Sequence, residues 1–259
     1  MTYIALVSLM VQSAGSLLAG EPVLVSEGYR FSEGPLWIAG EGLVFSDVRG
    51  DSLHRADGAV YRKPSNNANG LALDSDGRLI ACESKLKRIT RTEKDGSITV
   101  LADNFGGKSL NTTNDVAVRS DGGIYFTDPG ATSKTSLSTN GVYRIDPKSG
   151  ELSELTTTAR YPNGIGFSPD EKTLYVTDFM GAQIRQYDVA KNGSVSNERT
   201  FCEVLNPDGF ALDEQGNLWT SYREGVAVFD RAGTLIESFE LPMKPTNCCF
   251  GGGDGMTLF

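Results

Sequence analysis

A short pattern of residues recurs six times along this chain. A polar residue followed by glycine, aspartate or cysteine opens an apolar run, and in most copies a turn and a second apolar run follow. The six copies are EGPLWIAGEGLVFSD from Glu33, NGLALDSDGRLIACES from Asn69, NDVAVRSDGGIYFTDP from Asn114, NGIGFSPDEKTLYVTDF from Asn163, DGFALDEQGNLWTSY from Asp208 and NCCFGGGDGMTLF from Asn247. Successive copies begin 36 to 49 residues apart. Repeats of roughly 40–45 residues with about four strands each are typical of β-propellers.

The repeat predicts an all-β fold, a six-bladed β-propeller in which residues 21–259 form a single domain. One four-stranded blade is too thin to bury both of its faces, and stacking blades in a ring covers them. The last copy, residues 246–259, is too short for four strands, so we expect the last blade to be incomplete at the C-terminus. Residues 22–29 could add an outer strand. An edge that stays unpaired could associate with other chains.

The composition is that of a folded acidic domain. Hydrophobic residues make up 39% of the chain, and the formal net charge is −9. Such a surface is repelled by phosphate backbones, so a nucleic-acid partner is not expected. The four cysteines lack metal-binding CxxC spacing, and buried free thiols are the expected state, with one disulfide as the alternative in an exported protein.

An apolar run, IALVSLMV at residues 4–11, stands near the beginning of the sequence. It is too short to span a bilayer, and no other segment looks membrane-spanning. Small residues follow it, as at a signal-peptidase site, although no lysine or arginine precedes it. We therefore predict that residues 1–20 are a signal peptide, with a disordered tail as the alternative. A signal would make the protein periplasmic or secreted, and without one we expect it in the cytoplasm.

The first residues of the six copies all carry side-chain oxygen. The innermost strand of each blade begins there, so these side chains should converge at one end of the central channel. Asparagine and aspartate are also common turn residues, which is the structural alternative. Carboxylate and amide oxygens suit a hard divalent cation such as calcium. Zinc is disfavoured by the single histidine, His54.

The chain resembles the senescence marker protein (regucalcin)/gluconolactonase family, bacterial sugar-lactonase type. The similar segments are FSEGPLW, LIACES, SLNTTNDVAVRSDGGIYFTDP, YPNGIGFSPDEKTLYVTD, PDGFALDEQGNLWTS and TNCCFGG. They span residues 22–259 in order. The resemblance implies one catalytic divalent cation at the channel mouth, with ligands that fall on Glu33, Asn114, Asn163 and Asp208.

The resemblance also implies roles for individual residues. Asp208 is the expected general base, and Asn114, Asn69 and Thr112 are the expected substrate-binding residues. Thr112 stands where regucalcin-type relatives carry an arginine, which puts recognition of acidic substrates in doubt.

The implied reaction is hydrolysis of a small-molecule sugar lactone, with a cation polarising the carbonyl and Asp208 activating water. Calcium is the expected ion, and Zn²⁺, Mg²⁺ and Mn²⁺ are alternatives. The alternative functions are a non-catalytic calcium-binding propeller and a phosphotriesterase-like hydrolase with the same metal site.

Overall fold

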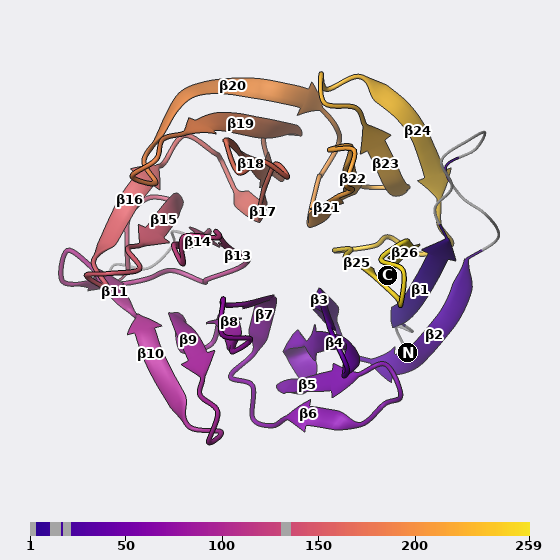
Figure 1. Cartoon of the computed structure of the whole chain (residues 1–259), viewed down its shortest axis with the longest axis horizontal. Helices are drawn as coiled ribbons and strands as arrows, with labels where there is room; N and C mark the ends of the chain where they lie inside the picture. Colours follow the sequence, from indigo (N-terminus) through magenta and orange to yellow (C-terminus); the bar gives the residue numbers. More distant parts are fainter. Residues whose placement is uncertain (1–3, 11–16, 18–21, 131–135) are drawn as a thin grey trace.

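The computed structural model describes residues 4–10, 17, 22–130 and 136–259. These residues form antiparallel sheets arranged in a ring around a central channel (Figure 1). Within this part of the chain, five blades are each made from one continuous stretch of sequence. The all-β propeller prediction is confirmed in this respect.

Each blade runs outward from the channel, and its first strand is the innermost. Blade 1 contains β3 (Ser32–Ile38), β4 (Gly42–Asp47), β5 (Ser52–Arg55) and β6 (Val60–Arg62), with the 3-10 helix η1 (Val48–Gly50) after β4. Blade 2 contains β7 (Ala68–Leu73), β8 (Leu79–Glu83), β9 (Arg88–Thr92) and β10 (Ile98–Ala102). A small hairpin follows, formed by β11 (Asn104–Phe105) and β12 (Lys108–Ser109).

The other three blades repeat this arrangement. Blade 3 contains β13 (Val116–Val118), β14 (Ile124–Asp128), β15 (Gly141–Ile145) and β16 (Leu152–Thr156). Blade 4 contains β17 (Pro162–Phe167), β18 (Thr173–Asp178), β19 (Gln183–Val189) and β20 (Val195–Glu203). Blade 5 contains β21 (Phe210–Leu212), β22 (Leu218–Ser221), β23 (Gly225–Phe229) and β24 (Leu235–Glu240).

The ring is closed by a composite sheet built from both ends of the chain. Its strand order is β2 (Val23–Tyr29), β1 (Ile4–Met10), β26 (Thr257–Leu258) and β25 (Phe250–Gly251), and we call it the closing sheet (Figure 1). The predicted six-bladed propeller with an incomplete last blade is therefore wrong. The described residues form five blades, and the closing sheet has four strands because β1 lies between β2 and β26. The expectation that other chains associate with an unpaired edge depended on this incomplete last blade, so the reason for it is lost.

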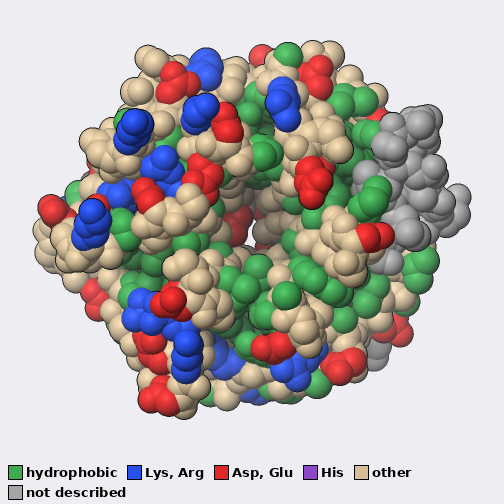
Figure 2. All heavy atoms as spheres, in the orientation of Figure 1, with side chains coloured by type: hydrophobic (Ala, Val, Ile, Leu, Met, Phe, Trp, Pro, Cys, Tyr) green, Lys and Arg blue, Asp and Glu red, His purple; other side chains and the backbone are tan. Residues whose placement is uncertain are grey.

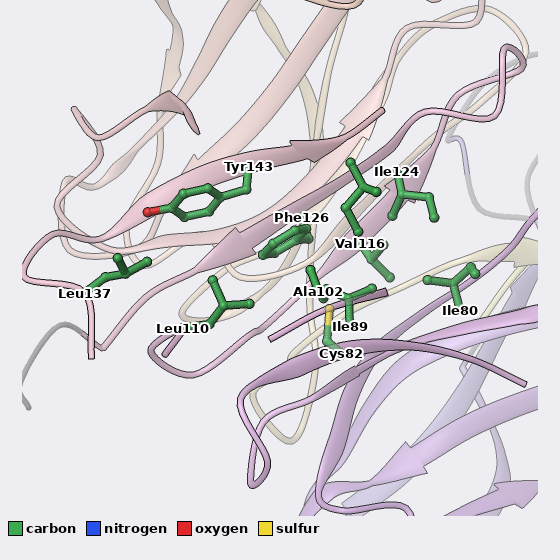
Figure 3. Packing of buried hydrophobic residues seen from close by; sticks show 11 residues of the cluster. Ile80, Cys82, Ile89, Ala102, Leu110, Val116, Ile124, Phe126, Leu137 and Tyr143 are labelled. Carbon is green, nitrogen blue, oxygen red and sulfur yellow. The ribbon is translucent and has the colours of Figure 1, made fainter. Parts of the chain in front are cut away.

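The hydrophobic core lies between neighbouring sheets rather than within one of them. In Figure 3, Ile80, Cys82 and Ile89 of blade 2 pack with Val116 and Phe126 of blade 3, and all five are buried. Burial of such side chains contributes about 1.5–3 kcal/mol each, which is why blades are stable only when stacked.

The structure also bears on the cysteines and on membrane-spanning segments. The expectation of free thiols is confirmed, because all four cysteines are unpaired; three are buried and Cys249 is half-buried. Among the described residues, no helix is long and apolar enough to cross a membrane.

Candidate active site

The innermost strands place the predicted site residues around the channel. Glu33, Asn69 and Asn163 lie at the beginning of β3, β7 and β17, and Asn114 and Asp208 lie two residues before β13 and β21. Adjacent innermost strands contact one another from β3 through β7, β13 and β17 to β21, and β25 contacts β3. Residues up to 175 positions apart are therefore held at the same level of the ring, as the repeat predicted.

Three of the predicted metal ligands form a buried cluster with Asn247. Glu33, Asn163 and Asp208 are only 6–8% exposed. The side chains of Asn163 and Asp208 are hydrogen-bonded to each other. Asn247 Nδ2 donates to Glu33 Oε2 at 3.4 Å, which joins the closing sheet to blade 1. The structure thus brings two carboxylates and two amides together from blades that are separated in sequence.

A further carboxylate, Asp115, belongs to this cluster and was not among the predicted site residues. It accepts the main-chain N–H groups of Val116 at 2.9 Å and Ile165 at 3.3 Å, so it joins blades 3 and 4. Its position directly after Asn114, in the ND pair that opens the third copy of the repeat, was the available signal.

The electrostatics of the cluster are those of negative charges that lack compensation. Burial, followed by repulsion from Asp208 and Asp115, raises the pKa of Glu33 well above its usual value. Burial raises the pKa of Asp208 to about 7 and that of Asp115 to about 6. Because a low-dielectric site disfavours several ionised carboxyls, a bound cation would stabilise all three.

The contacts of the other predicted residues, Asn114, Asn69 and Thr112, involve their main chain. The main-chain oxygen of Asn114 accepts from Gly70 N–H at 2.7 Å, and the oxygen of Asn69 accepts from Ser46 Oγ at 2.7 Å. Thr112 is exposed, and its N–H donates to Pro129. These contacts position the main chain, so the substrate-binding roles of these three side chains stay predictions.

Buried hydroxyls on second strands fix the main chain of the ligand-bearing segments. Thr127 Oγ1 donates to the carbonyl oxygen of Asn163 at 2.6 Å, and Thr177 Oγ1 donates to that of Asp208 at 2.7 Å. Thr177 also accepts from Gly164 N–H at 2.7 Å. The same kind of bridge continues round the ring, from Ser46 to Asn69, Ser84 to Thr113, Ser221 to Thr246 and Thr246 to Ser32. These contacts set the spacing between neighbouring site residues.

Acidic residues at the ends of second strands hold the loops that lead into the site. Asp47 Oδ1 accepts from the N–H of Phe31 at 2.9 Å, and Asp178 Oδ1 accepts from that of Tyr161 at 3.0 Å. Asp128 accepts from Asn111 N–H at 2.8 Å. Each acid thus anchors the loop just before Glu33, Asn163 or Asn114. They are structural carboxylates, distinct from the channel cluster.

The channel beside the cluster is hollow, and most of the exposed lining of this hollow is polar although many of the lining side chains are apolar. A cavity of about 190 Å³ is lined by Gly34, Pro35, Leu71, Asp115, Val116, Ile165, Phe210, Ala211, Leu212, Asn247, Cys248, Cys249 and Phe250. Figure 2 shows a hollow at the centre of the ring, with acidic atoms in its depth and hydrophobic side chains around it. Asp115 and Asn247 are the members of the cluster that line this cavity, and its polar lining suits a small polar ligand.

One lysine and two aromatic rings stand beside Asp208. Lys244 Nζ lies 4.0 Å from Asp208 Oδ2 and 4.7 Å from the centroid of the Phe179 ring. The ring of Phe179 lies edge-on to Tyr161, with centroids 6.2 Å apart. Lys244 lies in the segment between β24 and β25 and was not among the predicted site residues.

The side chains present fit a divalent cation through a mixed donor set. Among the described residues, no three histidine, cysteine, aspartate or glutamate side chains are grouped closely enough to hold a metal ion by themselves. Glu33 and Asp208 would therefore need an amide oxygen such as that of Asn163 to complete a ligand set. Such all-oxygen sets are typical of calcium sites, and the raised pKa values of Glu33 and Asp208 in this buried place are consistent with one.

Comparison with known proteins gives a consistent family assignment. A gluconolactonase from Zymomonas mobilis is 30% identical over 277 residues, which cover 91% of this chain and 77% of the relative. Regucalcin from Xenopus laevis is 28% identical, covering 91% and 84% of the two chains. The solved structure of a gluconolactonase from Xanthomonas campestris superimposes with a TM-score of 0.79 at 36% identity, covering 86% of this chain and 80% of that one. The model of the SMP-30/gluconolactonase/LRE-like region matches residues 31–259, so this chain belongs to that family.

Proposed function

We propose that this chain hydrolyses a sugar lactone with the help of one divalent cation, and that calcium is the preferred ion. The supporting observation is the burial of Glu33, Asn163 and Asp208 as one cluster beside a cavity lined in part by Asp115 and Asn247. The gluconolactonases among its relatives support the choice of a lactone as substrate. Zn²⁺, Mg²⁺ and Mn²⁺ are the alternative ions.

The roles of the chain's own residues follow from their chemistry. A cation held by Glu33, Asn163 and Asp208 would supply Lewis-acid polarisation of the lactone carbonyl. Asp208 accepts the proton of the attacking water; a bound cation would lower the pKa of its carboxyl group, and a reactive lactone needs only a weak base. Asn163 orients the Asp208 carboxylate by their hydrogen bond. Asn114 is the proposed hydrogen-bond donor to the oxygen that gains negative charge.

The experiment is a panel of sugar lactones assayed after chelation and after return of Ca²⁺, Mg²⁺, Mn²⁺ or Zn²⁺ separately. We expect turnover to require an added ion and to fall at least 100-fold in Asp208→Asn and Glu33→Gln. Asp76→Asn is the matched control, because this carboxylate lies in a surface turn of blade 2 with a 60% exposed side chain.

The results separate the alternatives. Calcium binding without hydrolysis of any lactone would favour a non-catalytic propeller. Turnover that survives chelation, or wild-type turnover by Asp208→Asn, would refute the proposed mechanism.

A further inference from the structure

The position of Lys244 beside the carboxylate cluster suggests a specific role for its ammonium group. Among the described residues, Lys244 is the one lysine or arginine that forms an ion pair with a carboxylate of the cluster, at 4.0 Å from Asp208. Its side chain is 39% exposed, so its ammonium can also meet a molecule that enters the mouth. The Phe179 ring, 4.7 Å from Nζ, gives the ammonium a second contact that needs no counter-ion.

The segment that carries Lys244 is anchored close to the site. The carbonyl oxygen of Thr246 accepts from Gly209 N–H at 2.7 Å and from Ser221 Oγ at 2.9 Å. The hydroxyl of Thr246 donates to Ser32 at 2.9 Å. Lys244 is two residues from this anchor, which holds it near the place where the chain passes from blade 5 into the closing sheet beside blade 1. Its approach to Asp208 is therefore built into the closure of the ring.

Charge balance indicates what the lysine does. Glu33, Asp115 and Asp208 carry three negative charges when ionised, and one divalent cation leaves one of them uncompensated. Lys244 supplies the missing positive charge. Without it, the site would repel any anion that forms in it.

Lactone hydrolysis forms such an anion. Water adds to the carbonyl carbon, the ring carbon–oxygen bond breaks, and the ring oxygen takes a proton to become a hydroxyl group. The new carboxylic acid then loses a proton, so each turnover creates a hydroxy-acid carboxylate at the site.

We propose that Lys244 is a substrate-contacting residue that binds the carboxylate of the hydroxy-acid product and the negative charge that precedes it. This inference rests on the proposed function, and it extends the site to the wall formed by Lys244 and Phe179. It also explains how a site rich in carboxylates can bind an anionic product without Arg at position 112, where this chain has Thr112.

Two ligands of nearly the same shape test the inference. Gluconate and its neutral amide, gluconamide, differ in the charge of the carboxyl-derived group. We expect the calcium-loaded wild-type chain to bind gluconate about tenfold more tightly than the amide by calorimetry, as for loss of one charge-assisted hydrogen bond. Lys244→Met should abolish this preference and lower kcat/KM for the lactone about tenfold, whereas Lys244→Arg should keep most of both.

The matched control is Lys172→Met, which removes a lysine whose side chain is 80% exposed and pairs with Asp170 in a surface turn. Equal unfolding temperatures of Lys244→Met and the wild type would show that the fold is intact; if Lys244→Met does not fold, the comparison is made with Lys244→Gln. A preference for gluconate that persists without the lysine charge, or that is absent in the wild type, overturns the inference. If the wild type hydrolyses no lactone but shows a preference that Lys244→Met loses, the proposed function fails and the anion site stands.

Discussion

Thr177→Val removes a single hydroxyl that joins two site segments while keeping the shape of the side chain. Thr177 is fully buried, and its Oγ1 accepts from Gly164 N–H and donates to the Asp208 carbonyl oxygen, both at 2.7 Å. Valine leaves this N–H and this carbonyl without those partners. At about 1–3 kcal/mol for each of these two buried polar groups, we expect a loss of about 2–6 kcal/mol in the free energy of unfolding.

The same substitution should weaken the site beyond its effect on stability. Asp208 would lose the contact that fixes its main chain, and contacts that orient ligands typically change metal affinity by about 10–100-fold. Calcium titration by calorimetry and urea unfolding measure the two effects separately. Thr177→Ser should restore most of both, because it keeps the hydroxyl.

The control is another fully buried threonine, Thr90, whose Oγ1 donates to Glu83 Oε1 at 3.1 Å inside blade 2. Thr90→Val should lower stability and leave calcium affinity unchanged. If Thr177→Val binds calcium as the wild type does, or if Thr90→Val weakens binding equally, the hydroxyl bridges do not position the site.

Two further predictions concern pH and packing. Because the folded-state pKa of Asp208 is raised to about 7, the folded metal-free chain binds more protons than the unfolded chain between about pH 4 and 7, and the stability contributed by this group falls as pH rises through that range. Relative to wild type, metal-free Asp208→Asn should therefore be more stable at pH 8 than at pH 5. Equal pH profiles of the two proteins in thermal unfolding would contradict the raised pKa. Gly34→Ala would place a Cβ 2.1 Å from the Asn69 carbonyl oxygen at a φ of +50°, so it should destabilise the contact between blades 1 and 2 by more than about 2 kcal/mol. Gly58→Ala, at a φ of +86° with no atom within 4 Å, should cost only the backbone strain of about 1–2 kcal/mol. Equal losses of the two variants in urea unfolding would refute the close approach at Gly34.

The sequence predicted the parts of the fold that repeat locally. Each copy pairs an innermost strand with its neighbour through a short turn, so the positions of Glu33, Asn163 and Asp208 at the channel followed from their places in the repeat. The buried acids at the ends of second strands, such as Asp178, are also visible in the repeat, in SD, CE, TD and TD at corresponding positions. Their loop-anchoring role required the contacts of the structure.

The features that were missed depend on contacts between distant segments. Lys244 lies three residues before Asn247, in the connection between β24 and β25, and only the structure shows that its ammonium approaches Asp208. Thr127 and Thr177 look like ordinary strand residues, since threonine is common in strands, and only their hydrogen bonds across blades reveal their role. The closing sheet was missed because a run such as IALVSLMV has the apolar character of both a signal segment and a strand.

The closing sheet makes a direct prediction about residues 4–10. β1 pairs with β2 at Ile4↔Tyr29 and Ser8↔Val23, and with β26 at Leu9↔Leu258 and Met10↔Thr257. Deleting residues 1–10 would leave β2 without this partner and β26 paired only with β25. Loss of several such hydrogen bonds, at about 0.5–1.5 kcal/mol each, should lower the free energy of unfolding by about 3 kcal/mol. That corresponds to a fall of roughly 6–12 °C in the unfolding temperature for a domain of this size.

This prediction and the predicted signal peptide exclude each other. Cleavage near residues 17–21 would remove β1 from the mature protein, and the ring would have to close without it. The measurement is mass spectrometry of the protein from its native host, combined with thermal unfolding of the chain with and without residues 1–10. A mature chain that retains residues 4–10 and is destabilised by their deletion supports the role of β1 in closure. A mature chain that begins near residues 17–21, or a deletion variant as stable as the whole chain, would show that the ring closes by another pairing of β2 with β26.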